Sequence, residues 1–320
     1  MTDVAVIGAG AWGTARAIQA ARAGRAVTLW ARDPARAAAL AATRANPRLP
    51  GHALPAAVTI TAELPTAPLL LLVVPMQHLR AVAARLPPGG PLVACCKGLE
   101  AGSLRLPLEV LAEACPGRPA AVLTGPNFAH EIAAGLPAAA VVAARDPALR
   151  GAVVAALATP GFRLYGNEDA VGAQVGGAAK NVVAIAAGAV MGAGLGENAR
   201  AALITRGLAE LARLAAALGG QAETVSGLSG LGDLVLTCTG ATSRNYSLGV
   251  ALGQGRPLAE ILAGRTTVAE GVATAPALVA RATALGVELP LCTVVAAVVQ
   301  GRLTLAQAVD ALQARRLRDE

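Results

Sequence analysis

Aromatic side chains are scarce in this sequence: Phe, Tyr and Trp occur twice each and make up 2% of the 320 residues. A chain with so few rings has no interleaving of basic and aromatic residues on which nucleic-acid bases could stack. It also has no basic run of the nuclear-localisation type. The net charge of +7 is therefore interpreted as a solvated surface together with a site for a small anionic ligand, and nucleic acid is not an expected partner. Alanine supplies much of the 55% hydrophobic content, so helices should pack closely through small side chains.

Cysteine is also sparse, with five residues and no C-x-x-C pair, which suits a reducing compartment better than a disulfide scaffold. The apolar pattern of a folded strand starts at Val4, so no signal peptide is expected. The apolar tracts near Ala133–Ala144 and Val182–Leu195 are broken by Pro137 or are too short and glycine-rich to span a bilayer. These features predict a cytoplasmic protein with no membrane span. No metal site is expected, and a homodimer is left open.

Lysine is nearly missing: only Lys97 and Lys180 are lysines among 27 basic residues. An arginine keeps its proton in a protein, whereas a lysine can release it. Either the two lysines are remnants of a biased composition, or an ammonium is needed at these two places. Their surroundings in the sequence decide between these readings.

The stretch at the N-terminus organises the rest of the chain. Val4–Ile7 reads as a buried parallel strand, and Gly8, Gly10 and Gly13 follow with the G-x-G-x-x-G spacing at the start of a helical pattern. These glycines permit a sharp turn, close approach of a pyrophosphate, and close packing of the helix on the strand, while the helix start offers free N–H groups to phosphates. A second strand at Ala26–Trp30 supplies the context that the motif requires. We therefore predict dinucleotide binding.

The residues after the second strand bear on which dinucleotide is bound. Asp33 precedes Pro34 and looks like a helix N-cap, so Arg32 is the expected nucleotide contact. Because an arginine at this place accommodates the 2′-phosphate of NADP, the sequence favours NADPH over NADH. The alternative is a surface arginine at a strand end.

The pattern changes along the chain. Further strands are expected at Val58–Ile60, Leu69–Val74, Pro91–Cys96, Ala120–Leu123, Ala138–Ala143 and Phe162–Tyr165, with helices at Met76–Leu86, Ser103–Ala114 and Pro147–Leu157. From Asp169 onward only helical patterns follow, beginning with Val171–Met191. The prediction is an α/β domain with a parallel sheet over residues 1–175, followed by an all-α domain over 176–320. The active site is expected in the cleft between them.

The surroundings of both lysines in the sequence indicate a functional role: ligand binding for Lys97 and proton transfer for Lys180. Lys97 follows a strand at the carboxyl edge of the sheet, where open α/β sheets bind ligands, and the turn Thr124–Ala129 is expected at the same edge. Lys180 lies in an apolar, glycine-rich helix, where a charge is costly unless it faces a cleft or a partner. Burial lowers the pKa of a lysine from about 10.4 toward the range in which proton transfer is efficient.

Two polar segments in the helical half could serve the same site. Asp233 ends a glycine-serine loop and could orient Lys180, hold substrate hydroxyls, or merely cap a helix. Ser243, Arg244 and Asn245 offer a hydroxyl, a guanidinium and an amide in succession, which suits a phosphate; the alternative is a capped helix start.

Together these motifs resemble the bacterial-type NAD(P)-dependent sn-glycerol-3-phosphate dehydrogenases over essentially the whole chain. The resemblance rests on Gly8–Thr14, Lys97–Glu100, Gly125-Pro126-x-Phe128-Ala129, Lys180–Val182, Asn198–Gly207, Gly227–Leu234, Thr242–Asn245 and Val268–Gly271. It implies a Rossmann-type domain followed by a helical domain, and reduction of dihydroxyacetone phosphate to sn-glycerol 3-phosphate for glycerophospholipid synthesis.

The resemblance also implies roles for residues. Lys180 would be the proton donor and acceptor. The substrate would be lined by Lys97, Gly125, Asn127, Asp233, Ser243, Arg244 and Asn245. The cofactor would be met by Gly8, Gly10, Ala11, Trp12, Gly13, Arg32, Lys97, Ala129, Arg244, Val268 and Glu270. Five positions depart from the family pattern. Asn127 stands where serine or threonine is usual, and Ala11 replaces a common hydroxyl residue. Met76 and Met191 replace polar residues, and Tyr246 stands where a basic residue is more common.

Two other functions compete with this one. Another two-domain enzyme, of the β-hydroxyacid or 6-phosphogluconate dehydrogenase type, also uses a helix lysine after a nucleotide-binding half. The polar segment at Ser243–Asn245 favours the phosphotriose instead. A non-catalytic NAD(P)-binding regulator is the other alternative, and the presence of Lys180, Asp233 and Arg244 argues against it.

Overall fold

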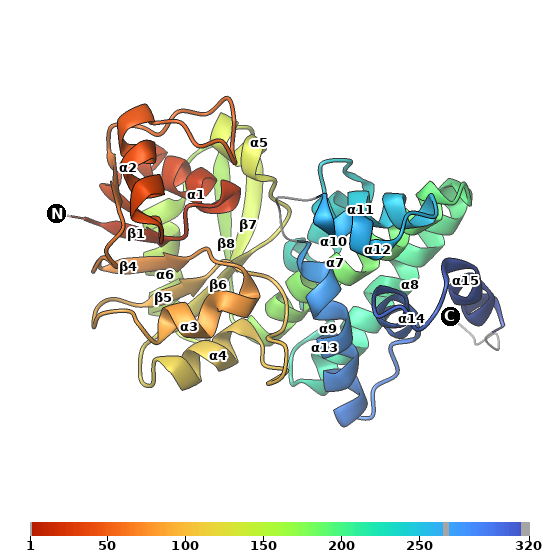
Figure 1. The fold of residues 1–320 in the computed structure, drawn as a ribbon. Coiled ribbons are helices and arrows are strands. Elements are labelled where there is room, and N and C mark those ends of the chain that lie inside the picture. Colours follow the sequence, from red (N-terminus) through yellow and green to blue (C-terminus); the bar gives the residue numbers. More distant parts are fainter. Residues whose placement is uncertain (1, 265–268, 315–320) are drawn as a thin grey trace. The chain divides into compact units, whose positions relative to one another are not determined.

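The computed structural model describes residues 2–264 and 269–314. These form two compact units (Figure 1). The first unit holds the described residues up to Lys97 together with Leu106–Ala173, and the second holds Gly98–Arg105 and the residues from Gln174 onward. Each unit has its own secondary-structure class, as the change of pattern in the sequence predicts.

The first unit is built on one eight-stranded sheet. Its strands are β1 (Val4–Ile7), β2 (Val27–Trp30), β3 (Val58–Thr61), β4 (Leu69–Leu72), β5 (Leu92–Ala94), β6 (Ala120–Thr124), β7 (Ala138–Ala143) and β8 (Phe162–Asn167). They lie in the order β3-β2-β1-β4-β5-β6-β7-β8. This confirms the predicted α/β fold of Rossmann type, with the glycine turn following the strand where the order reverses.

One strand pairing differs from the all-parallel prediction, because β7 runs antiparallel to β6. The connection between them contains only the short helix α5 (Ala129–Ala134). A parallel return needs a crossover of a dozen or more residues. β7 and β8 are parallel again, since α6 (Pro147–Leu157) provides a full crossover between them.

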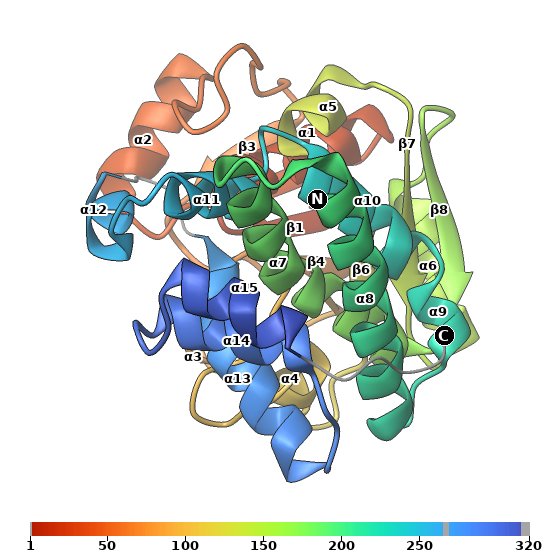
Figure 2. The ribbon, with the colours of Figure 1, turned by 90° about the vertical axis from the view of Figure 1, so that its right-hand side faces the viewer.

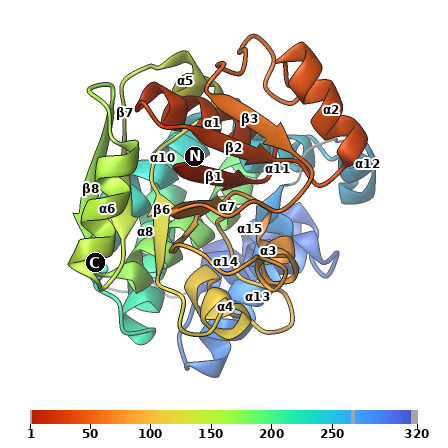
Figure 3. The ribbon, with the colours of Figure 1, turned by 90° about the vertical axis from the view of Figure 1, so that its left-hand side faces the viewer.

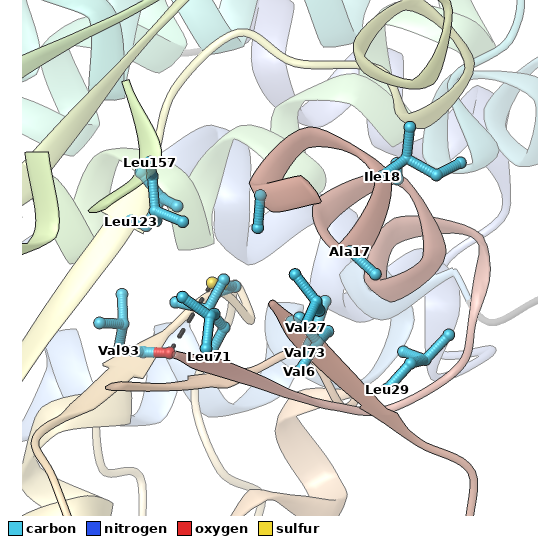
Figure 4. Packing of buried hydrophobic residues seen from close by; sticks show 14 of the residues in the cluster. Val6, Ala17, Ile18, Val27, Leu29, Leu71, Val73, Val93, Leu123 and Leu157 are labelled. Carbon is cyan, nitrogen blue, oxygen red and sulfur yellow. Dashed lines mark hydrogen bonds between the residues drawn. The ribbon is translucent and has the colours of Figure 1, made fainter. Parts of the chain in front are cut away.

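Helices cover both faces of this sheet (Figure 3). Successive side chains of a strand point to opposite faces: Val4 and Val6 belong to the core cluster on one face and Ala5 and Ile7 to the cluster on the other. The first cluster includes side chains of α1 (Ala11–Arg22), α2 (Pro34–Thr43), α5 and α6, and Figure 4 shows Ala17 and Ile18 of α1 above Val6 and Leu29. The second cluster includes side chains of the 3₁₀ turn η1 (Met76–His78), α3 (Leu79–Ala83) and α4 (Pro107–Ala114).

Two predicted helices are shorter than expected. The helix predicted over Ser103–Ala114 begins only at Pro107, because Leu104 has a φ of 60° and Leu106 is extended, as the residue before a proline usually is. The helix predicted over Met76–Leu86 is divided into η1 and α3.

The second unit is all-helical, as predicted (Figure 2). Its helices are α8 (Gly196–Ala217), α9 (Ala222–Val225), the π-helical turn η2 (Leu228–Gly232), α10 (Asp233–Thr239), α11 (Arg244–Gly253), α12 (Leu258–Ala263), α13 (Glu270–Ala284), α14 (Pro290–Val299) and α15 (Leu305–Gln313). The helix α7 (Ala170–Gly192) begins in the first unit and continues into the second.

Helix α7 is longer than the sequence predicts. Its 23 residues begin twelve residues before the tract Val182–Leu195, and by length and composition alone the helix could cross a membrane. However, 83% of its most apolar window is buried inside the protein, as in the core helix of a soluble protein.

Small residues let α7 and α11 pack at close range. A Cβ added to Gly188 would lie 2.1 Å from the carbonyl oxygen of Tyr246, and one added to Gly249 would lie 2.0 Å from that of Ile185. Each glycine therefore meets the backbone of the other helix, where a larger side chain would force the helices apart. This contact confirms the packing that the alanine- and glycine-rich composition predicts.

Candidate active site

The glycine turn after β1 fits a dinucleotide pyrophosphate. A Cβ on Gly8 would lie 2.5 Å from the oxygen of Val73, and one on Gly13 would lie 1.7 Å from the oxygen of Gly8, so both positions require glycine for the fold. A Cβ on Gly10 would meet nothing within 4 Å. Gly10 is also the N-cap residue of α1, and because glycine has no side chain, the helix start has no side-chain hydrogen bond from its cap. This uncapped start and the space beside Gly10 leave room for a phosphate at the helix N-terminus.

Two residues that the sequence analysis missed support this turn. The buried amide of Asn46 donates to the oxygen of Ala9 (3.1 Å) and to the hydroxyl of Thr14 (2.6 Å). The guanidinium of Arg36 also donates to the oxygen of Ala9. No local sequence pattern indicates these contacts, because Asn46 lies 37 residues after the carbonyl that it binds.

The end of β2 has the predicted local structure. The carboxylate of Asp33 accepts hydrogen bonds from the N–H groups of Ala35 (2.9 Å) and Arg36 (3.4 Å), which confirms its role as the N-cap of α2. Arg32, directly before it, is exposed. The carboxylate of Asp33 therefore caps α2, and Arg32 lies at the surface next to the end of β2.

Lys97 and the turn after β6 are neighbours, as predicted from their places at the edge of the sheet. The ammonium of Lys97 donates to the oxygen of Gly125 over 3.1 Å. Gly125 has a φ of +134° and its Cβ position lies 3.0 Å from the Cα of Ala140, so the turn requires glycine there. Asn127 follows in the same turn and is half-buried, as is Ala129, the first residue of α5.

The turn after β6 is tied to α1 by a residue that the sequence analysis passed over. Arg16 is fully buried, and its Nη2 donates to Oδ1 of Asn127 over 3.0 Å. Its guanidinium carbon lies 4.0 Å from the ring centre of Trp12 and 4.9 Å from that of Phe162. Burial lowers the pKa of Arg16 from 12.5 to about 10, against an opposing effect of Cys95, so the guanidinium is still charged at neutral pH.

In the second unit, Lys180 and Asp233 form a buried ion pair. Their side chains are 8% and 1% exposed, and the ammonium also donates to the hydroxyl of Thr237 over 3.0 Å. The carboxylate of Asp233 contacts Lys180, as the first of the three readings expects. It is not a cap, because α10 has Gly232 as its N-cap. Thr237 lies one turn after Asp233, and the sequence analysis missed it.

A glycine in α7 positions this pair. Gly176 precedes Lys180 by one helical turn, so both lie on the same face of α7. A Cβ on Gly176 would lie 2.6 Å from the oxygen of Ser229 in η2. The predicted glycine-serine loop is thus a π-helical turn packed against α7, and it leads directly into Asp233.

The segment at residues 243–245 begins helix α11. The hydroxyl of Ser243 accepts from the N–H of Tyr246 (3.2 Å), so Ser243 is the N-cap. The side chain of Asn245 donates to Oδ1 of Asn181 (2.9 Å) and accepts from the N–H of Gly271 (3.0 Å). Both serine and asparagine are buried.

Two other predicted residues lie at the starts of helices. Arg244 is exposed, and Glu270 is the first residue of α13. Val268 lies outside the described residues. Within the two ranges that the structure describes, no group of three or more His, Cys, Asp or Glu residues could hold a metal ion.

The sheet order, the glycine turn and the buried lysine–aspartate pair together define a nicotinamide-dinucleotide-dependent oxidoreductase. Comparison with known proteins narrows this class. A family model described as "NAD-dependent glycerol-3-phosphate dehydrogenase N-terminus" matches residues 3–150, and its C-terminal counterpart matches residues 169–310. The chain belongs to the NAD-dependent glycerol-3-phosphate dehydrogenase family, and its cofactor is NAD(P).

Individual relatives agree with this assignment. The chain is 63% identical over 255 residues to a glycerol-3-phosphate dehydrogenase [NAD(P)+] of Acidiphilium cryptum, covering 79% of each chain. It is 56% identical over 265 residues to the protein of that name from Gluconobacter oxydans, covering 81% of each. The crystal structure of the glycerol-3-phosphate dehydrogenase from Coxiella burnetii superposes with a TM-score of 0.94 at 37% identity, covering 98% of this chain and 99% of that one. The β-hydroxyacid and regulator alternatives are not supported by these matches.

Proposed function

We propose that this enzyme reduces dihydroxyacetone phosphate to sn-glycerol 3-phosphate, with the ammonium of Lys180 donating the proton to the oxygen at C2. A reduced nicotinamide, when bound, supplies the hydride to the carbonyl carbon. The oxygen then carries the negative charge and takes the proton from Lys180, and the reverse reaction returns it. The buried ion pair of Lys180 with Asp233 in an apolar helix is the observation that carries this proposal, because an ammonium is kept there despite its desolvation cost.

Asp233 and Thr237 hold the proton donor in place. The carboxylate of Asp233 stabilises the positive form of Lys180, and the hydroxyl of Thr237 accepts a second hydrogen bond from it. An ammonium fixed in this way can polarise a carbonyl oxygen without reorganisation during the reaction. Asn181, next to Lys180, is fixed by Asn245, so Asn245 supports the same stretch of α7.

The residues that would hold the two ligands come from both halves of the sequence. The substrate would be lined by Lys97, Gly125, Asn127, Asp233, Ser243, Arg244 and Asn245. The dinucleotide would be held by Gly8, Gly10, Ala11, Trp12, Gly13, Arg32, Lys97, Ala129, Arg244, Val268 and Glu270. Arg244 is exposed at the start of α11, where its guanidinium could form bidentate hydrogen bonds with the phosphate. The phosphate-binding energy would then serve orientation of the reacting carbonyl.

Five further features belong to this proposal. Arg32 favours NADPH over NADH because it binds the 2′-phosphate that only NADPH carries. The product supplies glycerophospholipid synthesis. The protein works in the cytoplasm without a nucleic-acid partner. A homodimer is compatible with the proposed function.

Replacement of Lys180 by arginine tests the proton-transfer role. Lys180→Arg keeps a positive charge beside Asp233 but cannot readily release a proton, so turnover should fall by roughly 10²–10⁴-fold. The measurement is the loss of absorbance at the reduced nicotinamide band with dihydroxyacetone phosphate, using NADH and NADPH in turn.

The only other lysine provides a comparison for this variant. Lys97→Arg keeps a donor toward the oxygen of Gly125, and its effect should fall mainly on the Michaelis constant. If Lys180→Arg turned over at a rate near that of the wild type, Lys180 would not be the acid. If the wild type reduced no dihydroxyacetone phosphate with either cofactor, the proposed reaction would be wrong.

A further inference from the structure

Arg16 is the largest buried polar side chain that the proposed reaction does not use. It is 0% exposed, and its Nε and Nη1 atoms have no hydrogen-bond partner among the described residues. Its one hydrogen bond to a side chain goes to Oδ1 of Asn127. A buried N–H group without a partner is destabilising, and burying an unpaired charge costs free energy. Fold stability therefore does not account for an arginine at this position.

The contacts of Asn127 determine which way its amide points. A guanidinium can only donate, so the atom that faces Arg16 is the oxygen. The nitrogen donates to the carbonyl oxygens of Ala139 (2.8 Å) and Pro126, which can only accept. Both N–H groups are thus used within the protein, and the oxygen has one lone pair left. Toward a ligand, Asn127 can act only as an acceptor.

This restriction selects one group of the proposed substrate. The carbonyl and the ionised phosphate of dihydroxyacetone phosphate can only accept hydrogen bonds, and its single hydroxyl is the only donor. An Asn127 that presents only a lone pair therefore complements the hydroxyl and neither of the other two groups. The guanidinium carbon lies over the rings of Trp12 and Phe162, and these rings limit its movement where it reaches Asn127.

We propose that Arg16 is a positioning residue that locks Asn127 as the acceptor for the substrate hydroxyl, and so contributes to the choice of a hydroxyketone phosphate over a methyl-ketone phosphate. The inference rests on the proposed function, since it assigns one part of the same substrate.

The test compares dihydroxyacetone phosphate with hydroxyacetone phosphate, the analogue in which the hydroxyl is replaced by hydrogen. The readout is the ratio of kcat/KM for the two ketones, because this ratio does not depend on the fraction of folded enzyme. The wild type should favour dihydroxyacetone phosphate by about ten-fold or more, as expected when a hydrogen-bonding group of the site loses its partner. In Asn127→Ala, which lacks the acceptor, the ratio should approach one.

Arg16→Met should lower the ratio nearly as far as Asn127→Ala, and Arg16→Met combined with Asn127→Ala should lower it no further. Arg16→Gln, which is uncharged and too short to span the distance to Asn127, should do the same and serves if the methionine variant does not fold. The matched control is Arg22→Met. Arg22 lies on the same helix and donates to the oxygens of Ile132 (3.0 Å) and Ala133 (2.8 Å), but makes no contact with Asn127.

Several outcomes separate this inference from the proposed function. Arg22→Met should keep the wild-type ratio, and Arg16→Met should have a melting temperature no lower than that of Arg22→Met. An unchanged ratio in both Arg16 variants would overturn the inference while the reaction stands. Dinucleotide binding can be measured by quenching of tryptophan fluorescence. If Arg16→Met lost dinucleotide binding while the ratio stayed unchanged, the accepting lone pair would face the cofactor, and the inference would also be overturned. A wild type without activity on either ketone would overturn the function itself.

Discussion

At the scale of single residues, the chain uses its two kinds of cation for different purposes. Arginines such as Arg22 and Arg25 tie elements of the first unit together by donating to carbonyl oxygens. The two lysines make other contacts: Lys97 donates to the oxygen of Gly125 in the turn after β6, and Lys180 is paired with Asp233. This division agrees with the physical difference between a guanidinium, which holds its proton, and an ammonium, which can transfer it.

Arg32 allows a prediction about cofactor choice. Because Arg32 is exposed at the end of β2 and Asp33 is used as a helix cap, Arg32→Ala should weaken NADPH binding by about 10–100-fold, the range for loss of charge-assisted hydrogen bonds. Binding of NADH, which has no 2′-phosphate, should change much less. The dissociation constants can be measured by fluorescence titration of the reduced cofactors.

Arg145, which is also exposed in the first unit but precedes α6, is a suitable control for this experiment. Arg145→Ala should alter neither constant. Equal weakening of NADH and NADPH by Arg32→Ala would remove the 2′-phosphate from the role assigned to Arg32.

At the scale of elements, one buried carboxylate joins two helices of the second unit. Glu210 of α8 is 3% exposed and accepts from the N–H groups of Leu291 (2.6 Å) and Cys292 (3.1 Å) at the start of α14. It thus caps α14 from a distance of about eighty residues in the chain. Burial raises the pKa of Glu210 above its ordinary value of 4.5, against a smaller lowering by these two hydrogen bonds.

This shift predicts how stability depends on pH. Since the pKa of Glu210 is higher in the folded than in the unfolded protein, its contribution is fully present below pH 4.5 and is lost as the pH rises through the raised value. Glu210→Gln cannot ionise. The free energy of unfolding of the wild type should therefore fall relative to that of the variant as the pH rises from about 4.5 to 7. Urea unfolding of both proteins across this range measures the difference, and a constant difference would contradict the prediction.

At the scale of the whole molecule, two units with separate cores share one long helix. α7 begins in the first unit and carries Lys180 in the second. The family models for the two halves match residues 3–150 and 169–310, so each half of the family pattern covers most of one unit. Binding of a dinucleotide to the native protein should stabilise it by mass action, by about 2.7 kcal/mol at one hundred times the dissociation constant.

Gly10 separates this stabilisation from the stability of the fold itself. Its φ of −73° suits any residue, and a Cβ there meets nothing within 4 Å. Gly10→Val should therefore melt within a few degrees of the wild type without ligand, yet gain little from NADPH because the side chain fills the space of the pyrophosphate. Gly13→Ala is the contrast: its Cβ would lie 1.7 Å from the oxygen of Gly8, so it should melt lower even without ligand. Differential scanning fluorimetry with and without NADPH measures both; a full NADPH shift in Gly10→Val would place the pyrophosphate elsewhere.

Much of this could be predicted from sequence because the relevant signals are local. A four-residue apolar run followed by G-x-G-x-x-G predicts β1, its turn and α1, and the Asp33-Pro34 pair predicts the start of α2. The errors also have local causes, such as Leu106 before Pro107 delaying α4. The π-helical turn η2 was predicted as a loop because its glycines are turn signals, whereas packing against Gly176 holds it in helical form.

The sequence by itself determined the secondary-structure class of each half and the position of the glycine turn, since both depend on residue types and their spacing along the chain. It also marked out the two lysines, because lysine is so scarce. Only the tertiary structure decided which side chains meet. Asp233 and Thr237 reach Lys180 across 53 and 57 residues, and Arg16 reaches Asn127 across 111. Such contacts arise from the packing of whole helices and turns against one another, and no spacing in the sequence specifies the direction in which a buried side chain finally points.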